Sequence, residues 1–107
     1  MKKELRYTPE ARKDLATVWM GVWAASKDFD TADRYINDLQ DTIGKRKQFP
    51  FSGIPLYYQN LFTGYYSVNF KAYKAFYRIN GEFIEVIRIL PIKTNYIQIL
   101  FNEETEL

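Results

Sequence analysis

The sequence predicts a single α+β domain in which a helical hairpin packs on an antiparallel β-sheet. Two segments with apolar residues at helical spacing follow a short N-terminal strand, and the stretch from Gly64 to Leu90 alternates like three short antiparallel strands. Asn80-Gly81, between the last two of these strands, is a strong hairpin signal. With 107 residues, the domain 1–107 is long enough to bury roughly two-thirds of its unfolded surface.

The first expected elements are a strand over Lys3–Tyr7 and a helix that runs to about Ser26. Thr8 can cap the helix, Pro9 fits the first helical position, and Glu10 lies where the helix dipole favours an anion. Apolar residues then recur at helical spacing, namely Ala11, Leu15, Val18, Trp19 and Val22. These signals predict an amphipathic helix.

A second helix is expected after a break at Asp28-Phe29-Asp30-Thr31. Its apolar stripe consists of Ala32, Tyr35, Ile36, Leu39 and Ile43, and its last turn is Gly44-Lys45-Arg46-Lys47, where cations complement the helix dipole. Two prolines and a glycine between Phe49 and Pro55 then predict an irregular loop. Four apolar residues are expected to hold this loop against the body: Tyr57, Tyr58, Leu61 and Phe62.

The hairpin around Asn80-Gly81 predicts a register, because a type I′ turn takes these two residues at its centre. Ile79 is therefore expected opposite Glu82, and Tyr73 opposite Arg88. In this register one face of the sheet carries Lys74, Phe76 and Arg78, and the other carries Arg88 with Tyr73 and Tyr77. Pro91 to Asn95 ends the last strand, and Tyr96 to Phe101 forms a short closing segment.

The chain contains no cysteine and no histidine. Disulfides, thiolate nucleophiles and thiolate zinc sites are excluded, and so is the usual general base near neutral pH. Any catalysis must use Lys, Arg, Tyr, Asp or Glu, and we expect no metal and no cofactor. Because no run of about 18 apolar residues occurs, we expect a cytoplasmic protein without a membrane partner.

The net charge of +2 understates the positive charge of most of the chain, because Glu103, Glu104 and Glu106 crowd its C-terminus. A positive body can approach a polyanion or hold an acidic peptide, although many proteins with this charge bind neither. Charge alone leaves the partner open.

The order of elements and several short motifs resemble the RelE/ParE superfamily, the toxins of bacterial type II toxin–antitoxin modules. The motifs are Arg6-Tyr7-Thr8-Pro9-Glu10-Ala11 with Asp14-Leu15, Phe49-Pro50 with Gly53 and Pro55, Phe76-Tyr77-Arg78-Ile79-Asn80-Gly81, and Ile87-Arg88-Ile89-Leu90 before Tyr96. The resemblance covers nearly the whole chain. It implies the fold described above, a toxin that arrests growth, and a cognate antitoxin as partner.

The resemblance leaves two activities open. RelE-like members are ribosome-dependent ribonucleases that cut mRNA. If this chain has that activity, the resemblance implies catalytic roles for Lys74, Lys93 and Tyr96. Tyr65 and Ser67 stand where some such members have paired lysines, and Pro91-Ile92-Lys93-Thr94 replaces their common His-Gly-Arg-Arg.

ParE-like members inhibit DNA gyrase by binding it, without bond-making chemistry of their own, and we favour this branch. Its implied target-binding surface comprises Lys74, Arg78, Arg88, Lys93 and Tyr96. A degenerate member that only binds an antitoxin is a third alternative.

Each of these residues also has a structural interpretation. Lys74 and Arg78 fit solvent-facing strand positions, with Arg78 reaching Glu85 diagonally across the strand pair. Arg88 interrupts an apolar run, so it requires a carboxylate, carbonyl or aromatic partner and suits a structural anchor. Tyr96 fits a packing residue.

Three residues of the first helix suggest a partner surface. Met20 and Trp23 flank the apolar stripe that contains Trp19, which makes the stripe wider than one sheet covers. By resemblance, Trp19, Met20 and Trp23 bind the antitoxin, whose tail is flexible and often acidic. The alternatives are a wide buried stripe or a homodimer contact, so either a homodimer or a toxin–antitoxin hetero-oligomer is expected.

Overall fold

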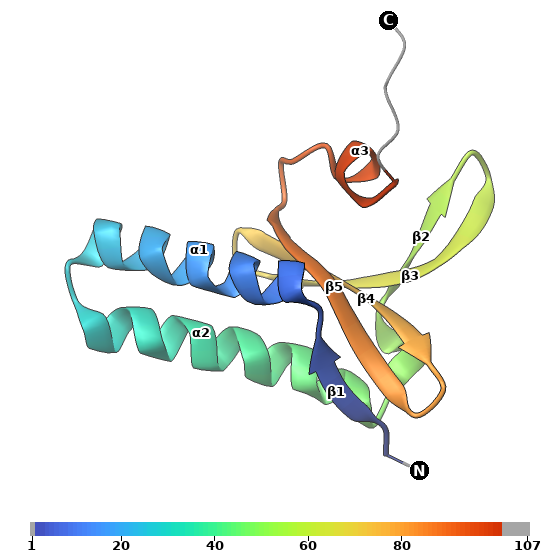
Figure 1. Ribbon diagram of the computed structural model, residues 1–107, viewed down its shortest axis with the longest axis horizontal. Helices are drawn as coiled ribbons and strands as arrows, with labels where there is room; N and C mark the ends of the chain where they lie inside the picture. The colour runs from blue at the N-terminus through green and yellow to red at the C-terminus, as the bar shows by residue number, and fades with distance from the viewer. Residues whose placement is uncertain (1, 102–107) are drawn as a thin grey trace, which may run out of the picture.

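The helical hairpin packs on one face of a five-stranded sheet in the computed structural model, which describes residues 2–101 (Figure 1). The strands are β1 (Glu4–Tyr7), β2 (Ile54–Tyr58), β3 (Leu61–Phe70), β4 (Tyr73–Asn80) and β5 (Phe83–Pro91), in the order β1-β5-β4-β3-β2. The helices are α1 (Pro9–Ser26), α2 (Phe29–Gly44) and α3 (Tyr96–Phe101). β1 runs parallel to β5, and the other neighbours are antiparallel. The predicted α+β class is confirmed. Glu103, Glu104 and Glu106 lie outside the described residues.

The start of α1 forms as its local signals predict. The Thr8 hydroxyl accepts a hydrogen bond from the Ala11 amide at 3.1 Å and donates one to the Ile87 carbonyl at 2.9 Å. Pro9 occupies the first helical turn, where its missing N–H costs nothing. One side chain therefore caps the helix and ties it to β5.

The break between the two helices is shorter than the sequence indicated. Lys27 ends α1 in the left-handed conformation with φ 57°, and the Asp28 carboxylate accepts from the Asp30 amide at 3.2 Å. Because Asp28 is an N-cap, α2 already begins at Phe29. At the other end, α2 stops at Gly44 and Lys45–Lys47 form a separate 3₁₀ turn, so the predicted last helical turn was wrong.

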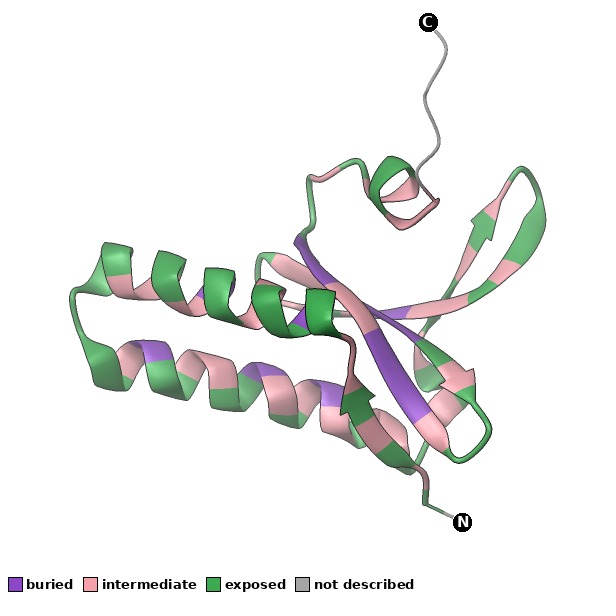
Figure 2. Cartoon of the chain, in the orientation of Figure 1, coloured by how far each residue is buried: buried purple, intermediate pink, exposed green. Residues whose placement is uncertain are grey.

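The core lies between the hairpin and the sheet (Figure 2). Its buried members come from the two predicted helical stripes and from the central strands: Ala11, Val18, Leu39, Ile43, Ala75, Val86 and Ile89. Leu15, Val22, Tyr35 and Ile36 pack around them with part of their surface exposed. The helical spacing of the apolar residues thus identified the buried face correctly.

The expected loop before the sheet contains an extra strand. Pro50–Ser52 form a 3₁₀ turn, and β2 then pairs with β3 at the edge of the sheet. Pro55 is tolerated there because an edge strand need not donate every backbone N–H. The predicted packing of this region was also wrong, because Tyr57, Leu61 and Phe62 are exposed, while Tyr58 stacks on Phe101.

The β4–β5 register differs from the predicted one by two residues next to the turn and by three residues beyond a bulge. Asn80 pairs with Phe83, and Gly81 takes the first turn position with φ 60°, as in a type II′ turn. A bulge between Phe76 and Tyr77 then places Arg88 opposite Phe76, not Tyr73. The predicted grouping of Arg88 with Tyr73 and Tyr77 was therefore wrong, because a bulge changes which residues share a face.

The closing segment forms helix α3 on the sheet face that the hairpin leaves open. Tyr96 packs on Phe76 with ring centroids 5.2 Å apart, and Phe101 stacks on Tyr65 at 5.5 Å. Phe76 follows Ala75, which faces the hairpin, so the two side chains point to opposite faces. Among residues 2–101, no helix is long and apolar enough to span a membrane.

Candidate functional site

The structure brings Lys74 and Tyr96 together on the face covered by α3. Lys74 is half-buried on β4, between Asn69 of β3 and Leu90 of β5. Its ammonium group lies 5.9 Å from the centroid of the Tyr96 ring, and that ring rests on Phe76. The phenol is thus held by packing, and the cation–π contact leaves the ammonium group able to bind an anion.

Arg78 is bound to a carboxylate. Its Nε donates to Glu85 Oε1 at 2.7 Å, and Arg6 Nε donates to Glu85 Oε2 at 2.8 Å. Asn80 adds a third hydrogen bond to Glu85 at 3.2 Å. The hydrogen bond from Arg78 lowers the pKa of Glu85 most, the bonds from Arg6 and Asn80 add to it, and burial opposes them. Arg78 lies directly opposite Glu85, not diagonally, and its side chain remains 47% exposed beside this ion pair.

Arg88 has the carboxylate partner that its apolar surroundings require. Its Nε and Nη2 donate to the two oxygens of Asp14, at 2.7 and 3.1 Å, and Asp14 also accepts from the Ile89 amide at 2.9 Å. The hydrogen bond that Arg88 donates to Asp14 raises the pKa of Arg88, against the effect of burial. This two-point ion pair joins α1 to β5, which is the geometry of a structural anchor.

Lys93 lies apart from these pairs, in the exposed turn that follows β5. The turn is closed by a hydrogen bond from the Thr94 amide to the Pro91 carbonyl at 3.0 Å. Within residues 2–101, Lys93 makes no hydrogen bond, ion pair or ring contact, and the structure does not bring it against Lys74 or Tyr96. It is a free cation next to α3.

The end of the helical hairpin carries a second candidate surface. Trp19 donates from its indole nitrogen to Asp33 at 2.8 Å, and Phe29 stacks on Trp19 and Trp23 at 5.8 and 5.9 Å. Met20 and Phe29 are exposed, while the two indoles are half-buried. The sequence analysis placed Phe29 in the break between the helices and therefore did not single it out. The packed aromatic group shows that this stripe is neither fully buried nor fully free.

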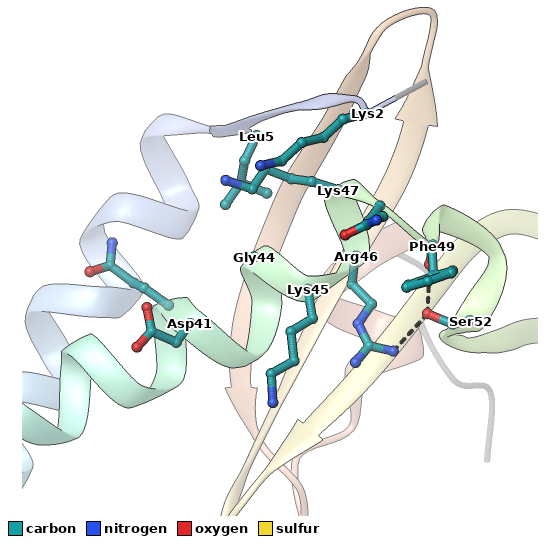
Figure 3. A pocket seen from close by; sticks show the side chains of 11 residues that line it. Lys2, Leu5, Asp41, Gly44, Lys45, Arg46, Lys47, Phe49 and Ser52 are labelled. Atoms are coloured by element: carbon teal, nitrogen blue, oxygen red, sulfur yellow. Dashed lines mark hydrogen bonds between the residues drawn. The ribbon is translucent and has the colours of Figure 1, made fainter.

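A basic cleft that the sequence analysis did not single out lies between the start of β1 and the end of α2 (Figure 3). It has a volume of about 790 Å³ and is lined by four cations, Lys2, Lys45, Arg46 and Lys47, against one acidic residue, Asp41. Arg46 donates to the Ser52 hydroxyl at 2.8 Å, and its Nε is buried without a hydrogen-bond partner among the described residues. The run Lys45-Arg46-Lys47 was the available signal, but it was interpreted as a helix end.

The chemistry available on the α3 face is limited. Arg88 is held by Asp14 through two hydrogen bonds, and Arg78 shares Glu85 with Arg6, so Lys74, Lys93 and Tyr96 are the predicted residues that have no carboxylate partner within residues 2–101. Among residues 2–101, no group of three or more acidic side chains could hold a metal ion. The arrangement suits the binding of an anionic or polar partner better than proton transfer, which needs a positioned acid and base.

The fold is shared by proteins of toxin–antitoxin systems. A chain from the chromosomal ParDE system of P. aeruginosa matches with a TM-score of 0.71 and 17% identity, covering 86% of this chain and 98% of that one. A chain of the RelBE2 toxin–antitoxin complex of Mycobacterium tuberculosis matches with a TM-score of 0.57 and 21% identity, over 85% and 99% of the two chains. The YoeB/ParE toxin of Agrobacterium tumefaciens gives 0.55 and 23%, over 82% and 96%. These likenesses define a RelE/ParE-type fold.

The sequence itself matches the family model described as the ParE toxin of the type II toxin–antitoxin system, parDE, over residues 5–96. This chain therefore belongs to the ParE toxin family, and the superfamily predicted from its motifs is confirmed. Among curated protein sequences no significant match is found.

Proposed function

We propose that this toxin arrests growth by binding and inhibiting DNA gyrase, without cutting a nucleic acid itself. The observation that supports this most is the state of the cations on the α3 face. Arg78 and Arg88 are engaged with Glu85 and Asp14, so the cluster of free cations that a ribonuclease needs to stabilise a phosphorane is incomplete. An inhibitor requires only a stable surface.

The proposed target-binding surface consists of Lys74, Lys93 and Tyr96 with the exposed side of α3. Ile92 and Ile99 are exposed large apolar residues beside these groups, so the surface combines apolar contact with two cations. Arg78 and Arg88 take part indirectly, because their ion pairs fix the strands from which the surface projects. Such a mixture of apolar centre and charged rim is typical of protein–protein interfaces.

We further propose that a cognate antitoxin neutralises the toxin by covering the end of the helical hairpin. Trp19, Met20 and Trp23 lie there with Phe29 against both indoles. Lys27 places its ammonium group 4.9 Å from the Trp23 ring, which supplies a cation next to the aromatic group. An acidic segment with apolar residues would match this combination.

A supercoiling assay with purified gyrase and purified toxin tests the proposed target. We expect the toxin to inhibit supercoiling, and Ile99→Asp and Lys93→Ala each to raise the half-inhibitory concentration by at least tenfold, as expected when an interface contact is lost. Arg12→Ala, a change of an exposed residue on α1, is the matched control and should leave inhibition unchanged. A toxin that arrests growth but leaves gyrase fully active would refute the proposal.

A ribosome-dependent ribonuclease remains the second candidate, because Lys74 and Tyr96 do lie together. Ribosomes programmed with a defined message, followed by primer extension, distinguish the two activities. Cleavage within the A-site codon that Lys74→Ala abolishes would establish the ribonuclease and overturn gyrase inhibition. If neither activity is found and expression has no effect on growth, the chain is a degenerate member that only binds its antitoxin.

A further inference from the structure

The β2–β3 hairpin and the loop before it expose aromatic rings that neither the target surface nor the antitoxin surface uses. Phe51 is 71% exposed, Tyr57 59% and Phe62 47%, and Phe49, in the same loop as Phe51, is 64% exposed. The tip of the β2–β3 hairpin projects away from α1 and α2 (Figure 1). We call Phe49, Phe51, Tyr57, Phe62 and Tyr66 the aromatic surface.

The aromatic surface carries no charge and has none in its own chain segment. From Gln48 to Phe70 the sequence contains no Asp, Glu, Lys or Arg, although charged residues make up 26% of the chain. Exposed edge hairpins are normally protected by charges, especially lysines. Within this segment an acidic antitoxin tail would find no cation to pair with, and a second copy of the same segment would present no like charge. The nearest cations are those of the basic cleft, which Phe49 also lines and from which Arg46 donates to Ser52.

Four of the five rings are held in place before any partner arrives. Phe51 packs on Tyr66 at 5.9 Å, Phe62 on Tyr66 at 5.4 Å, and Tyr57 on Phe62 at 5.7 Å. Tyr66 in turn stacks on the buried Tyr77 at 5.6 Å. Because the side chains are already ordered by one another, association loses little side-chain entropy.

The exposed area fits a dimer. Four rings of roughly 200 Å² each, about 60% exposed, present about 500 Å² of apolar surface. A standard interface buries about 800 Å² on each partner, of which about 65% is apolar in homodimers, which also gives about 500 Å². The aromatic surface is thus as large as the apolar part of one standard interface.

We propose that two copies of this chain form a symmetric dimer by packing their aromatic surfaces against each other. The contact is face to face, because Pro55 lacks an N–H on edge strand β2 and makes pairing of two β2 strands unfavourable. The proposal does not depend on the target of the toxin, since the α3 face is not part of it.

Sedimentation velocity of the purified full chain, produced by cell-free synthesis, tests the dimer over micromolar concentrations. We expect the wild type to sediment as a dimer. Phe62→Lys should raise its dissociation constant by at least about 30-fold, because each substitution occurs twice in a symmetric interface. Leu61→Lys is the matched control: Leu61 is the neighbouring, 72% exposed residue on the opposite face of the same strand, and its substitution should leave the dimer intact.

Cysteine cross-linking gives an independent result, because the chain has no cysteine of its own. Tyr57→Cys should join two copies through a short bismaleimide, whereas Met20→Cys, at an exposed position on α1, should not. A wild-type chain that stays monomeric overturns the proposal. So does a dimer that survives Phe62→Lys and dissociates in Leu61→Lys, or equal cross-linking of the two cysteine variants. If Phe62→Lys fails to fold, as circular dichroism would reveal, the cross-linking result decides.

Discussion

Replacing Asp14 with alanine is expected to destabilise this toxin strongly, because one carboxylate joins α1 to β5. Asp14 accepts two hydrogen bonds from Arg88, at 2.7 and 3.1 Å, and one from the Ile89 amide at 2.9 Å. Its side chain is only 14% exposed, and that of Arg88 is 27% exposed. Removing the carboxylate leaves a guanidinium group and a backbone N–H without their partner, largely out of water.

The size of the effect follows from this partial burial. Breaking a fully buried ion pair costs about 3–5 kcal/mol, and each hydrogen bond to a charged group contributes about 1.5–3 kcal/mol. Because Arg88 retains some access to water, we expect Asp14→Ala to lower the free energy of unfolding by about 3 kcal/mol. For a domain of this length that corresponds to a fall in Tm of about 12–24 °C. Asp14→Asn keeps an acceptor and should cost about 1–2 kcal/mol less.

Urea unfolding followed by the fluorescence of Trp19 and Trp23 measures this change, since both indoles lie on α1. Asp38→Ala removes an exposed carboxylate from α2 and should change stability by less than about 0.5 kcal/mol. If Asp14→Ala were no more damaging than Asp38→Ala, the anchoring role of Arg88 would be refuted. If Arg88→Ala abolished toxicity without changing the free energy of unfolding, Arg88 would instead be a direct target-binding residue.

Three further predictions concern the fold. Gly53→Ala should lower the free energy of unfolding by about 1–3 kcal/mol, because the new Cβ would overlap the Tyr77 hydroxyl. When Tyr77 is already replaced by Phe, Gly53→Ala should lower the free energy of unfolding by less. If urea unfolding showed that the effects of the two substitutions simply add, this explanation would be contradicted. Thr8→Ala should cost about 1 kcal/mol through loss of the α1 cap, measured in the same way, and a change no larger than that of the exposed Thr17→Ala would argue against it. The pKa of Glu85 is lowered from 4.5 in the folded state, so the contribution of this carboxylate to stability is present above pH 4.5 and is lost as pH falls through the lowered pKa. Glu85→Gln should therefore make the free energy of unfolding depend less on pH in this acidic range. Identical pH profiles of the variant and the wild type would rule this out.

The parts of the fold that rest on neighbouring residues were predictable from sequence. Thr8, Pro9 and Glu10 defined the start of α1, and the apolar stripes of both helices identified the buried face. These predictions succeeded because capping and helical periodicity act over a few residues of one segment. The same signals supported the family resemblance that the match over residues 5–96 confirms.

The parts that depend on pairing between segments were predicted less well. A hairpin signal at Asn80-Gly81 fixed the presence of the turn but not which residues occupy its centre, and the bulge opposite Phe76 could not be read from β5 alone. β2 was missed because its proline excludes a central strand but not an edge strand, and only the sheet order shows where the edge lies.

The candidate site shows the same division. The sequence by itself determined which residues carry charge, that no histidine or cysteine is present, and that Arg88 needed a partner inside an apolar run. Only the tertiary structure decided that Asp14 is that partner, that Glu85 holds Arg78, and that Lys74 meets Tyr96. The reason is physical: the charge of a side chain is local chemistry, but whether a cation is free or paired depends on side chains brought together from distant parts of the chain.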